Sequence, residues 1–315
     1  MENEKKLKFD PTVLDDIETL IYELRTLYYS CGYKKYKMSK FEEYDLYVKN
    51  KDFLVSDRVI TFTDTSGKLM ALKPDVTLSI IKSTKDNQST LQKICYNENV
   101  YRVSKDTESY KEIMQAGLEC FGDVDRNVIG EVLTLAAKSL QLIRPDYVIE
   151  TAQLDILSDF ADMVSTDPAV KGALLKCVSE KNTHGITQLC EKNDISPDKA
   201  GPLKNLISIY GSPYDVMPDL RSICTKSQMG YLDEMESALN VVRNAGLGDH
   251  MIIDFSVVSD LKYYNGITFN GFVKGVPGSV LSGGQYDGLM HRMGRKSKAI
   301  GFAVYLDSIE RIAIS

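Results

Sequence analysis

The residues best suited to polar chemistry lie in a predicted strand, EIMQAGLECFG at 112–122. Side chains alternate along a strand, so Gln115, Gly117 and Glu119 share one face while apolar residues form the other. Gln115 and Glu119 are about 13 Å apart along such a strand, and the glycine between them leaves a floor for a small polar molecule. We therefore predict a groove with a polar group at each end. A sheet face open to water is the alternative, and this stretch alone slightly favours it.

Two further segments carry groups that can face a ligand. Asp75 follows a proline in LKPD at 72–75, where its carboxylate can accept a hydrogen bond from an ammonium group; a turn-forming aspartate is the favoured alternative. Tyr263 and Tyr264 precede an Asn265-Gly266 hairpin signal, which predicts opposite orientations at a strand end, one ring in the core and one facing a pocket. A tyrosine pair that only packs in the core is equally well supported.

Other motifs give little indication of catalysis. The segment LSGGQYDGL at 281–289 contains paired glycines, which predict a tight turn between a strand and a helix. A close approach of the backbone to a ligand is the less favoured alternative. No GxGxxG, P-loop, HExxH or GxSxG element occurs. The 6 cysteines include no CxxC pair and are accompanied by only 3 histidines, so we expect reduced thiols, no metal and no cofactor.

Length and charge limit the class of protein. A chain of 315 residues predicts one large α/β unit with an insertion or a second small domain. Its 38 basic and 44 acidic residues give a net charge of −6, which argues against nucleic acid as a main partner. The polar start, MENEKKLKFD, and the absence of an 18-residue apolar run predict a soluble cytoplasmic protein without membrane contact.

The elements that position these groups follow from hydrophobic periodicity. A helix opened by Asp10-Pro11 is expected to run to Cys31-Gly32, and a second helix to span 125–143. Strand patterns joined by short turns predict an antiparallel sheet; they lie at 58–64, 69–75, 92–103 and 112–122. Later strand patterns are DYVIETAQLDI, MIIDFSVV, ITFNGFVKG, SVLSGG and AIGFAVYL, before a short helical end. Helical periodicity at 157–247 predicts an inserted helical subdomain within a core of residues 1–156 and 248–315.

Taken in order, these segments resemble the catalytic core of class II aminoacyl-tRNA synthetases, and among them the histidyl-tRNA synthetases. The similar segments are LKPDVT (family L-R-P-E-G-T), YRVSKDTESYKEIMQAGLECFG (motif 2), LKYYNGITFNGF (L-D-Y-Y-T-G-x-x-F-E), SGGQYDGL (S/A-G-G-R-Y-D-G-L) and AIGFAVYLDSI (motif 3). The resemblance implies an α+β fold, an antiparallel sheet flanked by helices. It also implies a histidine pocket, with Asp75 at the α-amino group, Gln115 and Glu119 along the groove, Glu119 facing the imidazole, and Tyr263 and Tyr264 completing the walls.

Several positions depart from the family pattern that activates an amino acid. Serines replace two of its arginines, at Ser259 before the tyrosine pair and at Ser308 in motif 3, and Arg311 projects from a different point of the final helix. Gln285 replaces the arginine of G-G-R-Y. In motif 2 the arginine is retained as Arg102, but Ser104 replaces the acidic residue that usually follows two positions later. Loss of two charged partners of a developing phosphate charge costs about 3–6 kcal/mol, or about 10²- to 10⁴-fold in rate.

A histidine pocket without activation chemistry resembles the synthetase-like regulatory subunits of ATP phosphoribosyltransferase. That resemblance implies a non-catalytic subunit, required with a short-form catalytic subunit for the first step of histidine biosynthesis and for its feedback inhibition by L-histidine. It further implies a homodimer paired through about residues 10–55, and a remnant nucleotide or phosphate site at Arg102. The end of the chain seven residues after Ser308 leaves no room for an anticodon-binding domain. A histidyl-tRNA synthetase core without that domain is the main alternative, and a ligase that charges another acceptor is a third reading; Ser259 and Ser308 weigh against both.

Overall fold

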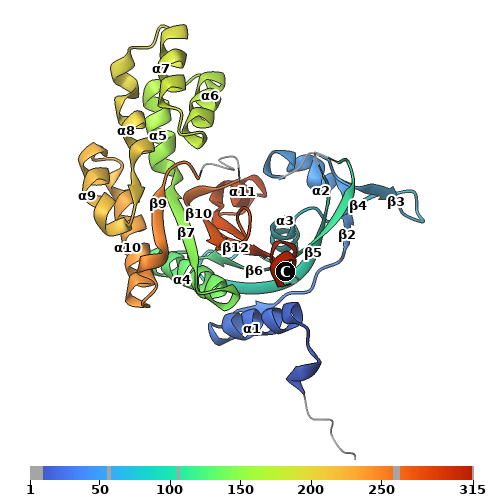
Figure 1. The fold of residues 1–315 in the computed structure, drawn as a ribbon. Helices are drawn as coiled ribbons and strands as arrows, with labels where there is room; N and C mark the ends of the chain where they lie inside the picture. The colour runs from blue at the N-terminus through green and yellow to red at the C-terminus, as the bar shows by residue number, and fades with distance from the viewer. Residues whose placement is uncertain (1–9, 55–57, 105–106, 258–262, 314–315) are drawn as a thin grey trace, which may run out of the picture.

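A nine-stranded sheet forms the centre of the molecule (Figure 1). The computed structural model describes residues 10–54, 58–104, 107–257 and 263–313. In sheet order the strands are β1 (Lys34–Lys35), β5 (Gln92–Val103), β6 (Tyr110–Gly122), β12 (Lys298–Tyr305), β11 (Leu281–Gln285), β10 (Asn265–Val273), β7 (Tyr147–Gln153), β9 (Met251–Asp254) and β8 (Tyr210–Gly211). The β1–β5 and β7–β9 pairs are parallel and the other pairs antiparallel. This mostly antiparallel arrangement with flanking helices confirms the predicted α+β class.

A separate three-stranded antiparallel sheet lies beside the large one. It consists of β2 (Phe41–Glu43), β4 (Leu69–Leu72) and β3 (Thr61–Thr63). Two of the four early strand patterns therefore form this small sheet, and only β5 and β6 are neighbours in the large one. The short elements α2 (Tyr44–Lys49) and η2 (Lys51–Phe53) follow β2, while α3 (Val76–Ser83) connects β4 to β5.

Two long helices cover one face of the large sheet, which Figure 1 shows as its lower face. The predicted start at Asp10 produces only a 3-10 turn, η1 (Pro11–Val13), whereas α1 (Asp16–Ser30) begins after Asp15 in a capping box with Glu18. The second helix, α4 (Arg126–Ile143), begins at the predicted place because Asp125 caps its first turn. Buried residues of both helices pack on the apolar face of β6 in one core cluster.

Six helices occupy the stretch in which helical periodicity dominates the sequence. They are α5 (Leu154–Val164), α6 (Pro168–Ser179), α7 (Thr183–Lys192), α8 (Gly201–Ser208), α9 (Pro213–Ile223) and α10 (Met229–Asn244), with the 3-10 turns η3 (Pro197–Ala200) and η4 (Gly248–His250). Figure 1 shows α5–α8 extending beyond the sheet, with α9 and α10 beside β9. The helical prediction is confirmed, and the division of the chain into two domains stays a prediction.

The Asn265-Gly266 pair does not form the predicted hairpin turn. It begins β10, where the register against β11 shifts between Asn265 and Thr268 and Gly266 has a φ of 60°. The preceding strand, β9, lies on the far side of β7 from β10, so no hairpin joins the two. The chain ends with α11 (Asp287–Arg292), β12 and α12 (Leu306–Ala313). Among the described residues, no helix is both long and apolar enough to cross a membrane.

Candidate functional site

A cavity of about 260 Å³ lies on the face of the sheet opposite α1 and α4. It collects all five residues predicted to bind histidine, together with Arg102. The residues that line it are Asp75, Val76, Thr77, Tyr96, Arg102, Gln115, Glu119, Tyr263, Tyr264, Asn270, Ser279, Ser282, Tyr286, Gly301, Phe302, Ala303 and Tyr305. Segments far apart in the sequence therefore meet here, because β6, β12, β11 and β10 are consecutive neighbours in the sheet.

The alternation along β6 places its polar residues in this cavity as predicted. Gln115 and Glu119 are buried, at 4% and 2% exposure, so the alternative of a sheet face open to water is wrong. The floor between them is not empty. The hydroxyl oxygen of Tyr96 lies 2.6 Å from the position that a Cβ atom would take at Gly117, so this glycine makes room for a tyrosine of the neighbouring strand.

Glu119 is held by two hydroxyl groups. Its Oε1 accepts a hydrogen bond from the Thr77 hydroxyl at 2.6 Å, and its Oε2 accepts one from the Tyr286 hydroxyl at 2.6 Å. Burial raises the pKa of Glu119 to about 8; these two hydrogen bonds act in the opposite direction, and the nearby Asp75 raises the pKa further. The carboxyl group is thus largely protonated at neutral pH when the cavity holds no cation.

Asp75 is a helix cap as well as a cavity residue. Its side chain accepts a hydrogen bond from the backbone N–H of Leu78 at 2.8 Å and so caps α3. The predicted alternative of a simple turn residue is thereby replaced by a capping role. Burial raises its pKa, and the hydrogen bond from Leu78 and the positive charge of Arg102 offset part of that rise. A second buried carboxyl group therefore lies in the same cavity without a full positive counter-charge.

The tyrosine pair lines the cavity with both of its members. Tyr263 and Tyr264 pack edge to face with ring centroids 4.7 Å apart, and Tyr263 lies 6.1 Å from the ring of Tyr286. Both residues precede β10, so strand alternation does not fix their orientations. Together the three phenols form an aromatic wall beside the carboxyl groups.

The paired glycines Gly283 and Gly284 lie inside β11, and the predicted tight turn between a strand and a helix follows at Tyr286, before α11. A Cβ atom at Gly284 would lie 2.8 Å from the Tyr264 ring, and one at Gly283 would lie 2.6 Å from Phe269. These glycines therefore admit aromatic side chains of the protein.

Sequence reasoning missed several cavity residues, among them Thr77, Tyr96 and Tyr286. Thr77 and Tyr286 fall within LKPDVT and SGGQYDGL, so their places in those segments were the available signal. Tyr96 carried no such signal, since only the register of β5 against β6 brings it opposite Gly117. Within the described part of the chain, no group of three or more His, Cys, Asp or Glu residues is placed to hold a metal ion.

Comparison with known proteins assigns the chain to a family. The sequence profile of histidyl-tRNA synthetases matches residues 8–309. The chain belongs to the histidyl-tRNA synthetase family. Among similar proteins of this family are ATP phosphoribosyltransferase regulatory subunits from Alkaliphilus metalliredigens, 29% identical over 89% of this chain and 72% of the relative, and from Clostridium kluyveri, 28% identical over 91% and 75%.

Solved structures of the histidyl-tRNA synthetase type share the fold. An ATP phosphoribosyltransferase regulatory subunit/histidyl-tRNA synthetase from Bacillus halodurans has a TM-score of 0.82 at 21% identity, covering 98% of this chain and 82% of that one. A chain of the ATP phosphoribosyl transferase (HisG:HisZ) complex from Thermotoga maritima has a TM-score of 0.71 at 17% identity, covering 93% and 97%. These likenesses confirm the class II synthetase-like architecture.

Three positions that carry arginines in the histidyl-tRNA synthetase pattern hold Gln285, Ser308 and Ser259 in this chain. Gln285 is buried, and its Oε1 accepts a hydrogen bond from the backbone N–H of Ile267 at 2.7 Å, so it supports the start of β10. Ser308 lies in α12, and Ser259 lies outside the described residues. Arg102 lines the cavity, and its Nε donates to the Pro74 carbonyl at 3.1 Å.

Proposed function

We propose that this chain is the non-catalytic regulatory subunit of ATP phosphoribosyltransferase and that it binds L-histidine in the cavity built around Glu119. Its partner is a short-form catalytic subunit, with which it forms a cytoplasmic hetero-oligomer that carries out the first step of histidine biosynthesis. Histidine is the feedback effector. The similarity to proteins named as regulatory subunits of this enzyme, over about nine-tenths of the chain, supports this assignment.

The observation that carries the choice of ligand is the pair of buried carboxyl groups beside the tyrosines. Burial raises the pKa values of both Glu119 and Asp75, and the positive charge of Arg102 offsets only part of the rise at Asp75. Histidine supplies an ammonium group for Asp75 and an imidazole N–H for Glu119, while Gln115, Tyr263 and Tyr264 offer further hydrogen bonds. Ligand binding thus offsets a desolvation cost that the protein already bears.

Histidine binding is tested by calorimetry on two matched variants. Glu119→Ala removes the group that faces the imidazole and should weaken binding by about 10- to 100-fold. Glu112→Ala is the control, because Glu112 is an exposed residue of the same strand outside the cavity. Equal histidine affinity in the wild type and Glu119→Ala would remove Glu119 from the binding site.

Amino-acid activation is not expected, because serines and a glutamine stand where the family pattern has arginines. Arg102 is the one arginine among the described residues that line the cavity. Histidine-dependent exchange of pyrophosphate into ATP measures this step directly. Turnover within about tenfold of an ordinary synthetase would contradict the regulatory assignment.

The decisive test is reconstitution with the short-form catalytic subunit. Formation of phosphoribosyl-ATP is measured with the catalytic subunit alone and with this chain, each with and without histidine. We expect this chain to raise turnover and to make it sensitive to histidine, because an effector acts by favouring one state of a coupled assembly. A catalytic subunit that is equally active alone, with unchanged histidine inhibition, would refute the proposal.

The building block of this assembly is a homodimer paired through about residues 10–55. This segment includes α1, β2 and α2, and it exposes Tyr29 and Phe41, each at 49%. Aromatic side chains of this kind are enriched in protein interfaces. Light scattering that gives a monomer near 35 kDa at micromolar concentration would contradict the dimer.

A further inference from the structure

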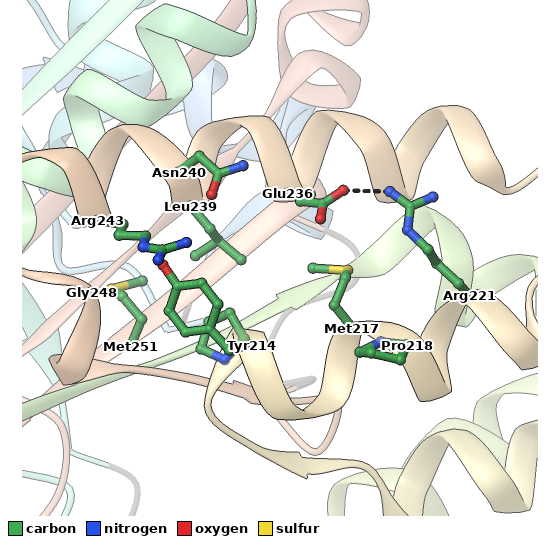
Figure 2. A pocket seen from close by; sticks show the side chains of 11 residues that line it. Tyr214, Met217, Pro218, Arg221, Glu236, Leu239, Asn240, Arg243, Gly248 and Met251 are labelled. Carbon is green, nitrogen blue, oxygen red and sulfur yellow. Dashed lines mark hydrogen bonds and ion pairs between the residues drawn. The ribbon is translucent and has the colours of Figure 1, made fainter.

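A second cavity lies among the inserted helices, between α9, α10 and the start of β9 (Figure 2). It encloses about 280 Å³ and shares no lining residue with the cavity around Glu119. Its lining consists of Pro213, Tyr214, Met217, Pro218, Arg221, Glu236, Leu239, Asn240, Arg243, Gly248 and Met251. Nothing in the proposed regulatory function uses these residues.

Two arginine contacts hold the helices together at the two ends of this cavity. At one end the guanidinium group of Arg243, in α10, lies over the Tyr214 ring of α9 at 4.1 Å. At the other end Nη2 of Arg221, in α9, contacts Asp233 at 2.9 Å and also Glu236, both in α10. The start of α9 meets the end of α10, and the end of α9 meets the first half of α10, so the two helices are antiparallel. The cavity lies between the two contacts (Figure 2).

The floor between these contacts is apolar and fixed. Met217, Leu239 and Met251 line it and are only 6%, 5% and 2% exposed. They come from α9, α10 and β9, so three separate elements surround the space. A cavity of this kind between packed helices is a usual place for a small ligand, and its volume is near the lower end for such sites.

The polar groups at the two ends differ in what they still offer a ligand. The Arg221 charge is balanced by Asp233 and Glu236. Within the described residues, Arg243 has no carboxylate partner, and its guanidinium group lies over the Tyr214 ring. A guanidinium group that stacks on an aromatic face keeps its in-plane N–H groups free, in the fork that matches a carboxylate. Asn240, one turn before Arg243 on the same side of α10, adds a carboxamide.

We propose that this cavity binds a small organic acid, with its carboxylate on Arg243 and Asn240 and its apolar body on Met217, Leu239 and Met251. Glu236 and Arg243 are about 10 Å apart along the helix axis, which limits the ligand to roughly the length of a six- to eight-carbon acid. The inference depends on these contacts and not on the proposed regulatory function.

The test uses hexanoate and phenylacetate as probes, with the neutral amides hexanamide and phenylacetamide as matched controls. Titrations are followed in the full-length protein through ¹³C-methyl signals of methionine, with Met217 and Met251 assigned by Met→Leu replacement. At least one acid should shift both signals with a dissociation constant of about 1 mM, as expected for a fragment of this size. Arg243→Gln should weaken that binding at least tenfold, because it removes the positive charge and the paired N–H donors of the guanidinium group.

The control variant is Arg126→Gln, which removes the same charge at an exposed position outside the cavity. It should leave the affinity for the acid unchanged. The proposal is overturned if neither acid saturates the two methionine signals, if the amide binds as tightly as its acid, or if Arg243→Gln and Arg126→Gln bind alike. Histidine binding measured in Arg243→Gln reports separately on the Glu119 cavity and shows that the variant is folded.

Discussion

Replacement of Glu119 by glutamine should remove a defined part of the pH dependence of stability. Glu119 has a pKa of about 8 in the folded protein because burial disfavours its charged form, against 4.5 in an unfolded chain. Between these values the folded protein holds a proton that the unfolded chain has released. Stability therefore falls as the pH rises from 4.5 to 8, and this slope vanishes above 8.

The size of the effect follows from the difference between the two pKa values. Each pH unit in this window costs about 1.4 kcal/mol, so the full penalty is about 5 kcal/mol and the part between pH 6 and pH 8 is about 2–3 kcal/mol. Glu119→Gln carries no proton to lose, and its amide can satisfy the hydroxyl groups of Thr77 and Tyr286. The variant should thus gain about 2–3 kcal/mol relative to the wild type from pH 6 to pH 8.

The assay is urea unfolding at pH 5, 6, 7 and 8, read as the difference between variant and wild type. Buried carboxyl groups that do not interact with Glu119 are present in both proteins and cancel in this difference, whereas Asp75 is coupled to Glu119 and contributes to it. Glu112→Gln is the control: hydrogen bonds from Asn99 and Tyr101 lower the pKa of Glu112, so it is ionised throughout and its difference should be flat. A Glu119→Gln difference that changes by less than about 0.5 kcal/mol from pH 6 to pH 8 would refute the reasoning.

Three further substitutions test the packing of the core and of the site, each by urea unfolding. Tyr28→Phe loses the 2.9 Å bond to the Ser139 hydroxyl, which keeps a backbone partner, so the cost should be about 1 kcal/mol; a cost above about 3 kcal/mol would mean that this account is incomplete. Lys73→Met removes the buried ammonium group that lies 3.0 Å from the Glu98 carboxylate and should lower the free energy of unfolding by about 3 kcal/mol. Adding Glu98→Gln should restore part of this loss. If it restores none, loss of the ion pair is not the cause. Gly301→Ala places a Cβ atom against a Glu119 oxygen and should cost about 3 kcal/mol and lower histidine affinity at least tenfold; wild-type affinity would contradict the packing.

The sequence predicted those parts of the fold that depend on local pattern. Strand β5 has the predicted limits, 92–103, and α4 begins after the predicted cap because Asp125 bonds two backbone N–H groups of the first turn. Strand partners were not predictable, since the patterns at 58–64 and 69–75 look the same whether they join a large sheet or form a small one. The Asn265-Gly266 signal failed because a glycine with positive φ serves a register shift as well as a hairpin.

The sequence predicted part of the lining of this cavity and not its geometry. Alternation along β6 correctly placed Gln115 and Glu119 together, and the resemblance added Asp75 and the tyrosines. The bonds to the Glu119 carboxylate come from Thr77 and Tyr286, which are 42 and 167 residues away in sequence. Such contacts depend on the order of strands in the sheet, and no local periodicity contains that information.

The protonation of Glu119 links ligand binding to pH. Without a ligand, the carboxyl groups of Glu119 and Asp75 are buried and disfavour each other's charge. A ligand that brings an ammonium group lowers the pKa of Glu119, so binding releases a proton below pH 8. Affinity for such a ligand therefore rises from pH 6 to pH 8, while the unliganded protein becomes less stable. A ligand that binds only the folded state adds stability as its affinity rises, so at saturating ligand this added stability offsets the loss that the empty site shows over the same pH range.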